Sequence, residues 1–222
     1  MQAYLLCVYD FWRVLVVRDL RTFEHFVMMC AARTGQLINL AALAADCGIN
    51  AVTAKQWLSV LDTSYVIRLL QPWHENFGKR LVKMPKLYFV DTGFLCHRLR
   101  IPDALSLGTH AMRGPVFESW VITETLKYRF NRGLAADLYF WRDNHGVEVD
   151  LVFPHQGRLH PIEIKSGRTF SEDWLNAGEK FKTYAKAHSA PLGVVYGGDA
   201  NFDFQGTAVS SWRMLMQASA KA

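Results

Sequence analysis

Two carboxylates and a lysine stand near the middle of this 222-residue chain at a spacing that suits metal-dependent chemistry. Asp150 lies in one apolar run, and Glu163 and Lys165 lie in the next. The loop between the runs contains Gln156 and Gly157 and is short enough for a β-hairpin. A hairpin that turns at these two residues sets Asp150 opposite Glu163. Lys165 then shares the face of Glu163, because alternate residues of a strand point the same way.

Asp150, Glu163 and Lys165 suit a site for Mg²⁺ or Mn²⁺, ions that prefer hard oxygen ligands in octahedral geometry and keep several waters. We expect Asp150 and Glu163 to supply carboxylates, and the Ile164 carbonyl to supply a third oxygen. Lys165 would orient or activate the attacking water and offset the charge of a phosphate. Glu118 would reach the metal from a helix upstream, directly or through water. The alternative is a buried ion-pair cluster that needs no metal.

Two further residues are expected to lie close to these ligands. Glu148 lies two residues before Asp150 on the same strand face, so it would add an acid around the metal. His145 lies beside this strand and could contact a phosphate, although a loop histidine is more often simply solvated.

The elements that must hold these residues follow one another in the second half of the chain. Pro115 suits the first turn of a helix that carries Glu118. Apolar patterns and turn residues predict the remaining elements. They predict a helix over 114–127, strands over 137–142, 147–153 and 159–165, a helix over 172–187, and strands over 192–196 and 208–212.

The first half of the chain reads as a helix-turn-helix followed by a β-hairpin, which is a winged helix. After a helix over about 14–32, an alanine-rich helix begins near residue 40, Gly48 supplies a tight turn, and Asn50 caps the next helix. Strands are expected over 65–70 and 86–90. The second helix would offer Thr53, Lys55 and Gln56 to phosphates or base edges, and the wing would carry Lys79, Arg80 and Lys83.

DNA binding by this module is weighed equally with packing against a neighbouring protein domain, since helix-turn-helix units often serve protein contacts. A polar connection over 101–109 separates the two halves. We therefore expect a winged-helix domain over 14–105 and a second domain over 106–222.

Composition narrows the classes of protein. Half of the residues are apolar and the formal net charge is +5, a mild bias toward polyanions. The four cysteines follow no zinc or disulfide spacing, so free thiols are expected. The sequence contains no P-loop motif, so no nucleotide site is expected, and no apolar run is long enough to span a membrane. The apolar start is a poor signal peptide, which favours the cytoplasm.

The order of these elements resembles that of the PD-(D/E)xK nuclease superfamily: a helix that bears a glutamate, a β-meander that bears Asp and Glu-x-Lys, and then a helix and a strand. Val149 stands where that superfamily has proline. Further motifs are Arg18-Asp19-Leu20, Ala32-Arg33-Thr34-Gly35-Gln36, Lys86-Leu87-Tyr88-Phe89-Val90-Asp91-Thr92-Gly93, Phe117-Glu118, Tyr139-Phe140-Trp141-Arg142, Glu148-Val149-Asp150 and Glu163-Ile164-Lys165-Ser166-Gly167.

With these motifs, residues 14–213 resemble the C-terminal half of a family of prokaryotic AAA+ ATPases, a half catalogued as a domain of unknown function. The resemblance implies an α/β (α+β) chain, with a winged helix followed by a PD-(D/E)xK nuclease-like α-β-β-β-α-β domain. It implies a Mg²⁺- or Mn²⁺-dependent deoxyribonuclease, or else a non-catalytic DNA- or protein-binding regulatory module. An ATPase or another protein would dock on the apolar residues 1–15, and a homo-oligomer could form through the same residues.

Overall fold

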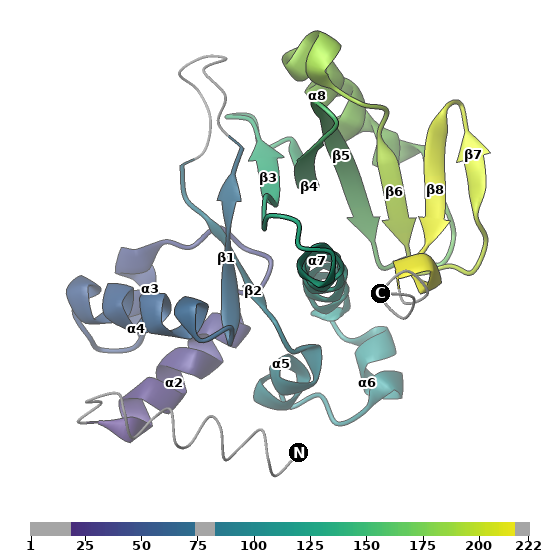
Figure 1. Cartoon of the computed structure of the whole chain (residues 1–222). Helices are drawn as coiled ribbons and strands as arrows, with labels where there is room; N and C mark the ends of the chain where they lie inside the picture. The colour runs from purple at the N-terminus through teal and green to yellow at the C-terminus, as the bar shows by residue number, and fades with distance from the viewer. Residues whose placement is uncertain (1–18, 74–82, 216–222) are drawn as a thin grey trace.

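A computed structural model describes residues 19–73 and 83–215, and these residues form a mixed α/β fold around one large sheet (Figure 1). In chain order its α-helices and strands are α2 (Leu20–Ala31), α3 (Leu40–Asp46), α4 (Ala51–Thr63), β1 (Ile67–Pro72), β2 (Lys86–Phe89), α5 (Thr92–Arg98), α6 (Ala104–Thr109), α7 (Arg113–Asn131), β3 (Tyr139–Arg142), β4 (Glu148–His155), β5 (Arg158–Lys165), α8 (Asn176–Ala185), β6 (Gly193–Tyr196), β7 (Phe202–Phe204) and β8 (Thr207–Ser211). Short 3-10 turns flank α8 at Glu172–Leu175 and Lys186–His188.

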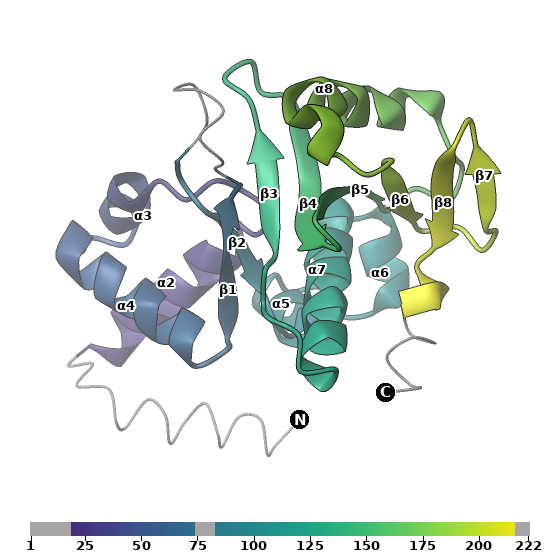
Figure 2. The same cartoon turned by 45° about the horizontal axis from the view of Figure 1, so that its top comes forward.

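The eight strands lie in the order β2-β1-β3-β4-β5-β6-β8-β7, so the hairpin of the first half and the strands of the second half share one sheet. Neighbours pair antiparallel except β1 with β3, β5 with β6, and β6 with β8, which are parallel. Two views show α2, α3 and α4 beside the β1 and β2 end of the sheet, with α7 near its middle (Figures 1 and 2). The sheet therefore joins the two halves of the chain.

Side-chain caps explain where several helices begin. Asn39 caps α3 and Asn50 caps α4, because each side-chain oxygen accepts a hydrogen bond from a backbone amide three residues on. Gly48 lies between these helices at φ +65°, a conformation that suits glycine. The helix, turn and helix predicted at this position are therefore confirmed as local structure.

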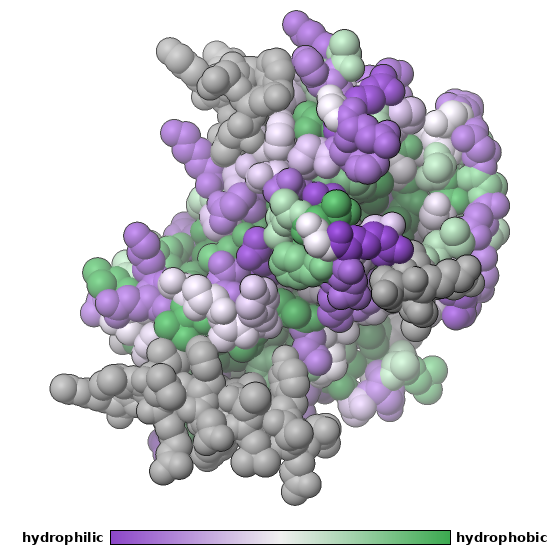
Figure 3. Space-filling model, viewed as in Figure 1, coloured by the Kyte–Doolittle hydropathy of each residue, from purple (hydrophilic) through white to green (hydrophobic). Residues whose placement is uncertain are grey.

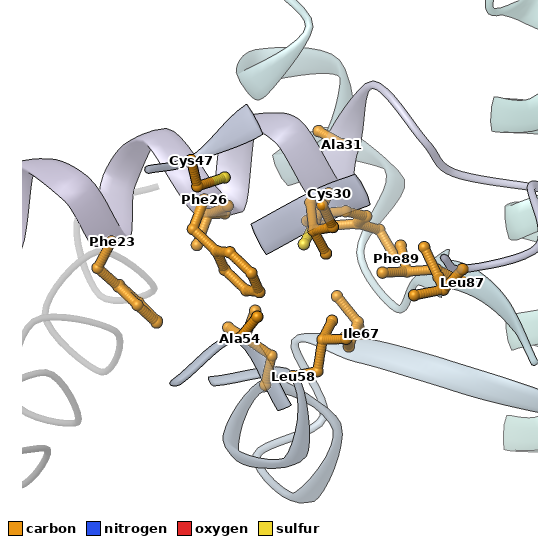
Figure 4. Close-up of a cluster of buried hydrophobic side chains, with 14 of the residues drawn as sticks. Phe23, Phe26, Cys30, Ala31, Cys47, Ala54, Leu58, Ile67, Leu87 and Phe89 are labelled. Carbon is orange, nitrogen blue, oxygen red and sulfur yellow. The ribbon is translucent and has the colours of Figure 1, made fainter. Parts of the chain in front are cut away.

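Helices α2, α3 and α4 pack around one hydrophobic core. Phe23, Phe26 and Cys30 project from α2 toward Leu58 of α4 and Ile67 of β1, and all of these side chains are buried (Figure 4). The ring of Trp57 packs edge-on against Phe23 and Phe26. Because this cluster reaches into the β1–β2 hairpin, it anchors the start of the shared sheet.

Two helices cover opposite faces of the sheet beside the candidate site. On β3, Phe140 packs with the helix α7 cluster that includes Ile122, whereas the next residue, Trp141, packs with Phe181 of α8. Successive strand residues point to opposite faces, so α7 and α8 lie on opposite sides. The face covered by α7 is the one toward which Glu118 projects from that helix.

Most predicted elements are confirmed, and a few differ. The connection expected over 101–109 contains the short helix α6, which Asp103 caps through a 2.7 Å hydrogen bond to the amide of Ser106. The short strand β7 was not predicted. The first predicted helix begins at Leu20 in the described structure, and its residues 14–18 lie outside the described ranges.

The structure also bears on membranes and thiols. Among the described helices, none is long and apolar enough to cross a membrane. Cys30, Cys47 and Cys96 are free thiols, as expected, and Cys7 lies outside the described residues. Burial raises the pKa of each of these three thiols.

Candidate functional site

The predicted hairpin is present with the predicted register. Strands β4 and β5 are joined by Gln156 and Gly157, whose φ angles are +49° and +74°, as in the tight two-residue turns that match strand twist. Leu151 pairs with Ile162 at the end of the ladder, so Asp150 and Glu163 are the next residues on the two strands. The local sequence was therefore enough to bring these two acids together.

A bulge in β4 gives Asp150 its particular position. Between two of its pairs with β3, β4 carries one extra residue, so Asp150 and Leu151 both lie opposite Phe140. The residues of β4 that pair with β5 run from Leu151 to His155. Just beyond them, Oδ2 of Asp150 accepts a 2.9 Å hydrogen bond from the amide of Ile164. A bulge changes the direction in which a side chain points. Here the Asp150 carboxylate bonds to a backbone amide of β5 at the end of the β4–β5 ladder.

Three carboxylates converge in front of this opening. Glu118 of α7, Glu148 of β4 and Asp150 each offer an oxygen, and these oxygens all lie within 4.8 Å of one another. Lys86, at the start of β2, donates to Oε1 of Glu118 at 3.1 Å and also to Oε1 of Glu148. Its side chain is only 3% exposed. An ammonium group therefore already lies between two of the acids.

Two further side chains hold these carboxylates in place. The Tyr88 hydroxyl donates a hydrogen bond to Oε1 of Glu118. Arg142, at the end of β3, donates to Oε2 of Glu148 at 3.1 Å. Because neighbouring strands supply these donors, the positions of both acids depend on the β2–β1–β3 part of the sheet.

Glu163 and Lys165 lie beside this trio on β5. Lys165 forms an ion pair with Oε1 of Glu163, and its Nζ lies 4.0 Å from Oδ2 of Asp150. Oε2 of Glu163 is buried and has no hydrogen-bond partner among the described residues. A buried, unpartnered carboxylate oxygen is costly, so this atom calls for a cation, a proton or a water.

Burial and crowding shift the pKa values of the acids upward. Burial raises the pKa of Glu118 to about 7 against the opposing charge of Lys86, and the Asp150 carboxylate adds to the rise. Burial also raises the pKa of Glu163 to about 8, again with help from Asp150 and against Lys165. The pKa of Asp150 itself is raised by burial, although Lys86 and Lys165 oppose the shift.

The pKa values of Lys86, Lys165 and Tyr88 are also raised. Burial alone would lower the pKa of Lys86, but the carboxylates of Glu118 and Glu148 outweigh it and raise the pKa. The pKa of Lys165 is raised in the same way, chiefly by Asp150 and Glu163. Burial raises the pKa of the Tyr88 hydroxyl well above its usual value. All three groups therefore stay protonated at neutral pH.

The donor set fits a hard divalent cation. All of its side-chain donors are carboxylate oxygens, the ligand type that Mg²⁺ and Mn²⁺ prefer. The unpartnered oxygen of Glu163 is a donor that such an ion would satisfy. Two protons, on the acids whose pKa values lie near 7 and 8, would have to leave before the ion could bind at full strength.

The structure brings together five of the residues singled out from the sequence, and it adds Lys86, Tyr88 and Arg142, which hold the acids. Lys86 was predicted only as the first residue of a strand. A lysine beside the apolar run Leu87-Tyr88-Phe89 was the available signal, because a buried ammonium needs carboxylate partners. Its partners lie 32 and 62 residues away, so spacing along the chain could not identify them. Glu148, expected at the margin, belongs to the central trio.

The residues proposed to touch DNA lie elsewhere. Lys55 and Gln56 are exposed on α4, whereas Thr53 is half-buried and its amide donates to the cap residue of that helix. Lys83 is exposed just before β2, and Lys79 and Arg80 fall outside the described residues.

His145 is exposed in the turn between β3 and β4, where its amide donates to Oδ1 of Asp143 at 2.9 Å. In the part of the chain that the structure describes, it makes no hydrogen bond or ion pair with the carboxylate cluster, which consists of Glu118, Glu148, Asp150 and Glu163. Contact between His145 and a phosphate therefore stays a prediction.

Comparison with known proteins finds two domain families and two relatives. Residues 2–105 match a domain of unknown function (DUF8612), and residues 113–215 match another domain of unknown function (DUF4143). The chain is 33% identical over 185 residues to the uncharacterized proteins Rv2008c of Mycobacterium tuberculosis and Mb2031c of Mycobacterium bovis. Each alignment covers 82% of this chain and 40% of the relative, so the chain spans well under half of their length. No solved structure matches.

Proposed function

We propose that this chain is a metal-dependent nuclease of the PD-(D/E)xK type that acts on DNA and carries a winged helix for positioning. One observation carries the proposal. Asp150, Glu163 and Lys165 meet at the point where the β4–β5 ladder opens, and the buried Oε2 of Glu163 has no partner among the described residues. Such an arrangement is what hydrolysis of a phosphodiester with a divalent cation would need.

The residues that would hold Mg²⁺ or Mn²⁺ are Asp150, Glu163 and Glu118, together with the Ile164 carbonyl. A bound divalent cation would polarise a phosphoryl oxygen and stabilise the charge on the leaving oxygen. Asp150 is held for this task by the amide of Ile164, and Glu118 is held by the Tyr88 hydroxyl. The bulge and the helix therefore fix the ligands before substrate arrives.

Lys165 would act on the water and on the phosphate. Its ammonium group lies against Glu163 and 4.0 Å from Asp150, so it can orient a water toward the phosphorus and offset negative charge there. Its raised pKa keeps it charged at neutral pH, so it serves as an electrostatic group and a hydrogen-bond donor. Its side chain is about one-third exposed, which leaves it within reach of a substrate.

DNA would be held by the first half of the chain. Lys55, Gln56 and Thr53 on α4 would contact phosphates or base edges, together with Lys79, Arg80 and Lys83 before β2. The net charge of +5 favours this partner. We place the protein in the cytoplasm, where residues 1–15 would dock an ATPase or another protein.

A second function has one observation in its favour. Lys86 already contributes a positive charge between Glu118 and Glu148, so part of the cluster is balanced without a metal. A cluster balanced in this way would suit a non-catalytic DNA- or protein-binding module that keeps the nuclease fold. That module would fold normally and would show no affinity for divalent cations.

Cleavage assays separate the two functions. The purified chain is incubated with supercoiled plasmid and with single-stranded DNA, in the presence of Mg²⁺, Mn²⁺ or EDTA. We expect cleavage that needs the metal and that Asp150→Ala or Lys165→Ala lowers by about 100-fold or more. Asp137→Asn is the matched control, because Asp137 is a half-exposed acid on the same half of the chain and lies outside the cluster, 3.8 Å from Arg129. Folded protein that cuts no DNA form with either metal would overturn the proposal.

A further inference from the structure

An open groove lies beside the carboxylate cluster. It has a volume of about 730 Å³ and runs between α6, α7 and the ends of β5, β6 and β8. The hydropathy-coloured surface shows exposed hydrophobic side chains at the lower right, where α6 lies in Figure 1 (Figure 3). The volume of the groove is in the range of ligand-binding pockets.

Three aromatic rings line the groove, together with aliphatic side chains that include Leu105 and Leu107. Phe117 stacks on Trp120 with ring centres 6.2 Å apart, and Trp120 meets Trp212 edge-on at 5.4 Å. All three side chains are half-buried, so part of each ring faces the groove. Exposed aromatic rings are the surfaces on which unpaired bases stack in proteins that bind single strands.

Three arginines border the same groove. Arg113 donates to the carbonyl oxygens of Ser166 and Gly108, and Arg168 and Arg213 both lie against Asp199. Arg168 is 72% exposed and Arg213 is 55% exposed, so both guanidinium groups can reach a ligand in solution. The residues that line the groove, within the described part of the chain, include no Asp or Glu. Asp199 offsets one of the three arginine charges, so the border of the groove keeps a net positive charge and favours an anion.

The groove and the cluster are built from the same two elements. Phe117 precedes Glu118 on α7, and Ser166 follows Lys165 at the end of β5. Arg113 joins these elements, because its guanidinium group on α7 donates to the carbonyl of Ser166. A DNA strand held in the groove would therefore leave it next to Lys165.

We propose that this groove binds an unpaired stretch of DNA strand, with bases on the aromatic rings and phosphates on Arg168 and Arg213. The inference rests on the proposed nuclease function and names its substrate: single-stranded or frayed DNA. A closed duplex keeps its bases stacked inside and offers none to the rings unless bases are flipped out. The combination of π surfaces and guanidinium groups matches the two features that a single strand presents, flat bases and regularly spaced phosphates.

Binding without cleavage tests this inference separately from catalysis. Fluorescence anisotropy in EDTA is measured with a labelled thymidine oligonucleotide of about twelve nucleotides and with a blunt duplex of the same length. We expect the single strand to bind more tightly than the duplex. Arg168→Gln should weaken single-strand binding about ten-fold, and Trp212→Leu at least about five-fold.

The control is Arg132→Gln, which removes an equivalent guanidinium group from the far end of α7, where it stacks on Tyr128. It should leave single-strand binding unchanged. Because Arg168 is exposed, its variant keeps the test sound even where Trp212→Leu disturbs folding.

Equal affinity for the two DNA forms would overturn the inference even if the protein cuts DNA. So would an Arg168→Gln variant that behaves like the control, or a dimer of the chain in light scattering that Trp212→Leu abolishes. Selective single-strand binding that depends on Arg168 would support the groove even if no cleavage is seen, and would then leave the nuclease proposal to its own assay.

Discussion

Replacing Lys86 by methionine is the perturbation with the clearest expected cost. The side chain is 3% exposed and its ammonium group contacts both Glu118 and Glu148, which are 15% and 17% exposed. Methionine keeps much of the length and removes the charge. The variant would thus leave two nearly buried carboxylates without their shared cation.

The expected loss is about 3–5 kcal/mol of unfolding free energy at about pH 8, the range for removing one partner of a buried ion pair. The loss should shrink as the pH falls. Burial already raises the pKa of Glu118 to about 7, above its usual value of 4.5, and removal of Lys86 would raise it further. A carboxyl with a raised pKa in the folded state destabilises increasingly as the pH climbs from its unfolded value through its folded one. The variant should therefore be closest to wild type at about pH 5.5.

Urea unfolding at both pH values, in EDTA, measures this difference. Lys127→Met is the matched control, since Lys127 pairs with Glu124 at 2.7 Å but is 51% exposed. That pair is a surface i,i+3 contact, so its loss should cost about 0.5 kcal/mol or less. If Lys86→Met costs no more than the control, or costs the same at both pH values, the account of a charge-balanced buried cluster is wrong.

Three other predictions concern the cluster and its supports. Magnesium should raise the melting temperature more at about pH 8.5 than at about pH 6, because Glu118 and Glu163, with pKa values of about 7 and about 8, must lose protons to bind it; equal shifts would contradict this. Gly197→Ala should lower cleavage about ten-fold or more in kinetic assays, because its Cβ would lie 2.5 Å from a backbone oxygen just after β5; an unchanged rate would show that the strand end tolerates movement. Gly178→Ala should destabilise α8 by about 1–3 kcal/mol in urea, since its Cβ would lie 2.5 Å from a leucine methyl, while Gly108→Ala, with nothing within 4 Å, should be neutral or stabilising.

Local chemistry explains why so many elements of both halves could be predicted. The turn at Gln156 and Gly157 sets the register of the hairpin by itself, so Asp150 and Glu163 could be paired without any tertiary information. The same holds for the helices capped by Asn39 and Asn50, because each cap bonds within its own first turn.

The features that were missed depend on distant parts of the chain. The extra residue of β4 opposite Phe140 appears only when β3 and β4 pair, and no local sequence pattern predicts it. Lys86 finds its carboxylates through the assembly of the whole sheet. The strand β7 spans only three residues, which is too short for a period to be recognised.

Calorimetric titration of Mn²⁺ into wild-type protein and Asp150→Asn at about pH 8 tests the central claim most directly. The account predicts a saturable site in wild type, loss of that site in Asp150→Asn, and its retention in the half-exposed control Asp137→Asn. Absence of binding to wild-type protein, or equal binding by wild type and Asp150→Asn, would contradict a metal centre at this cluster and would favour the non-catalytic module.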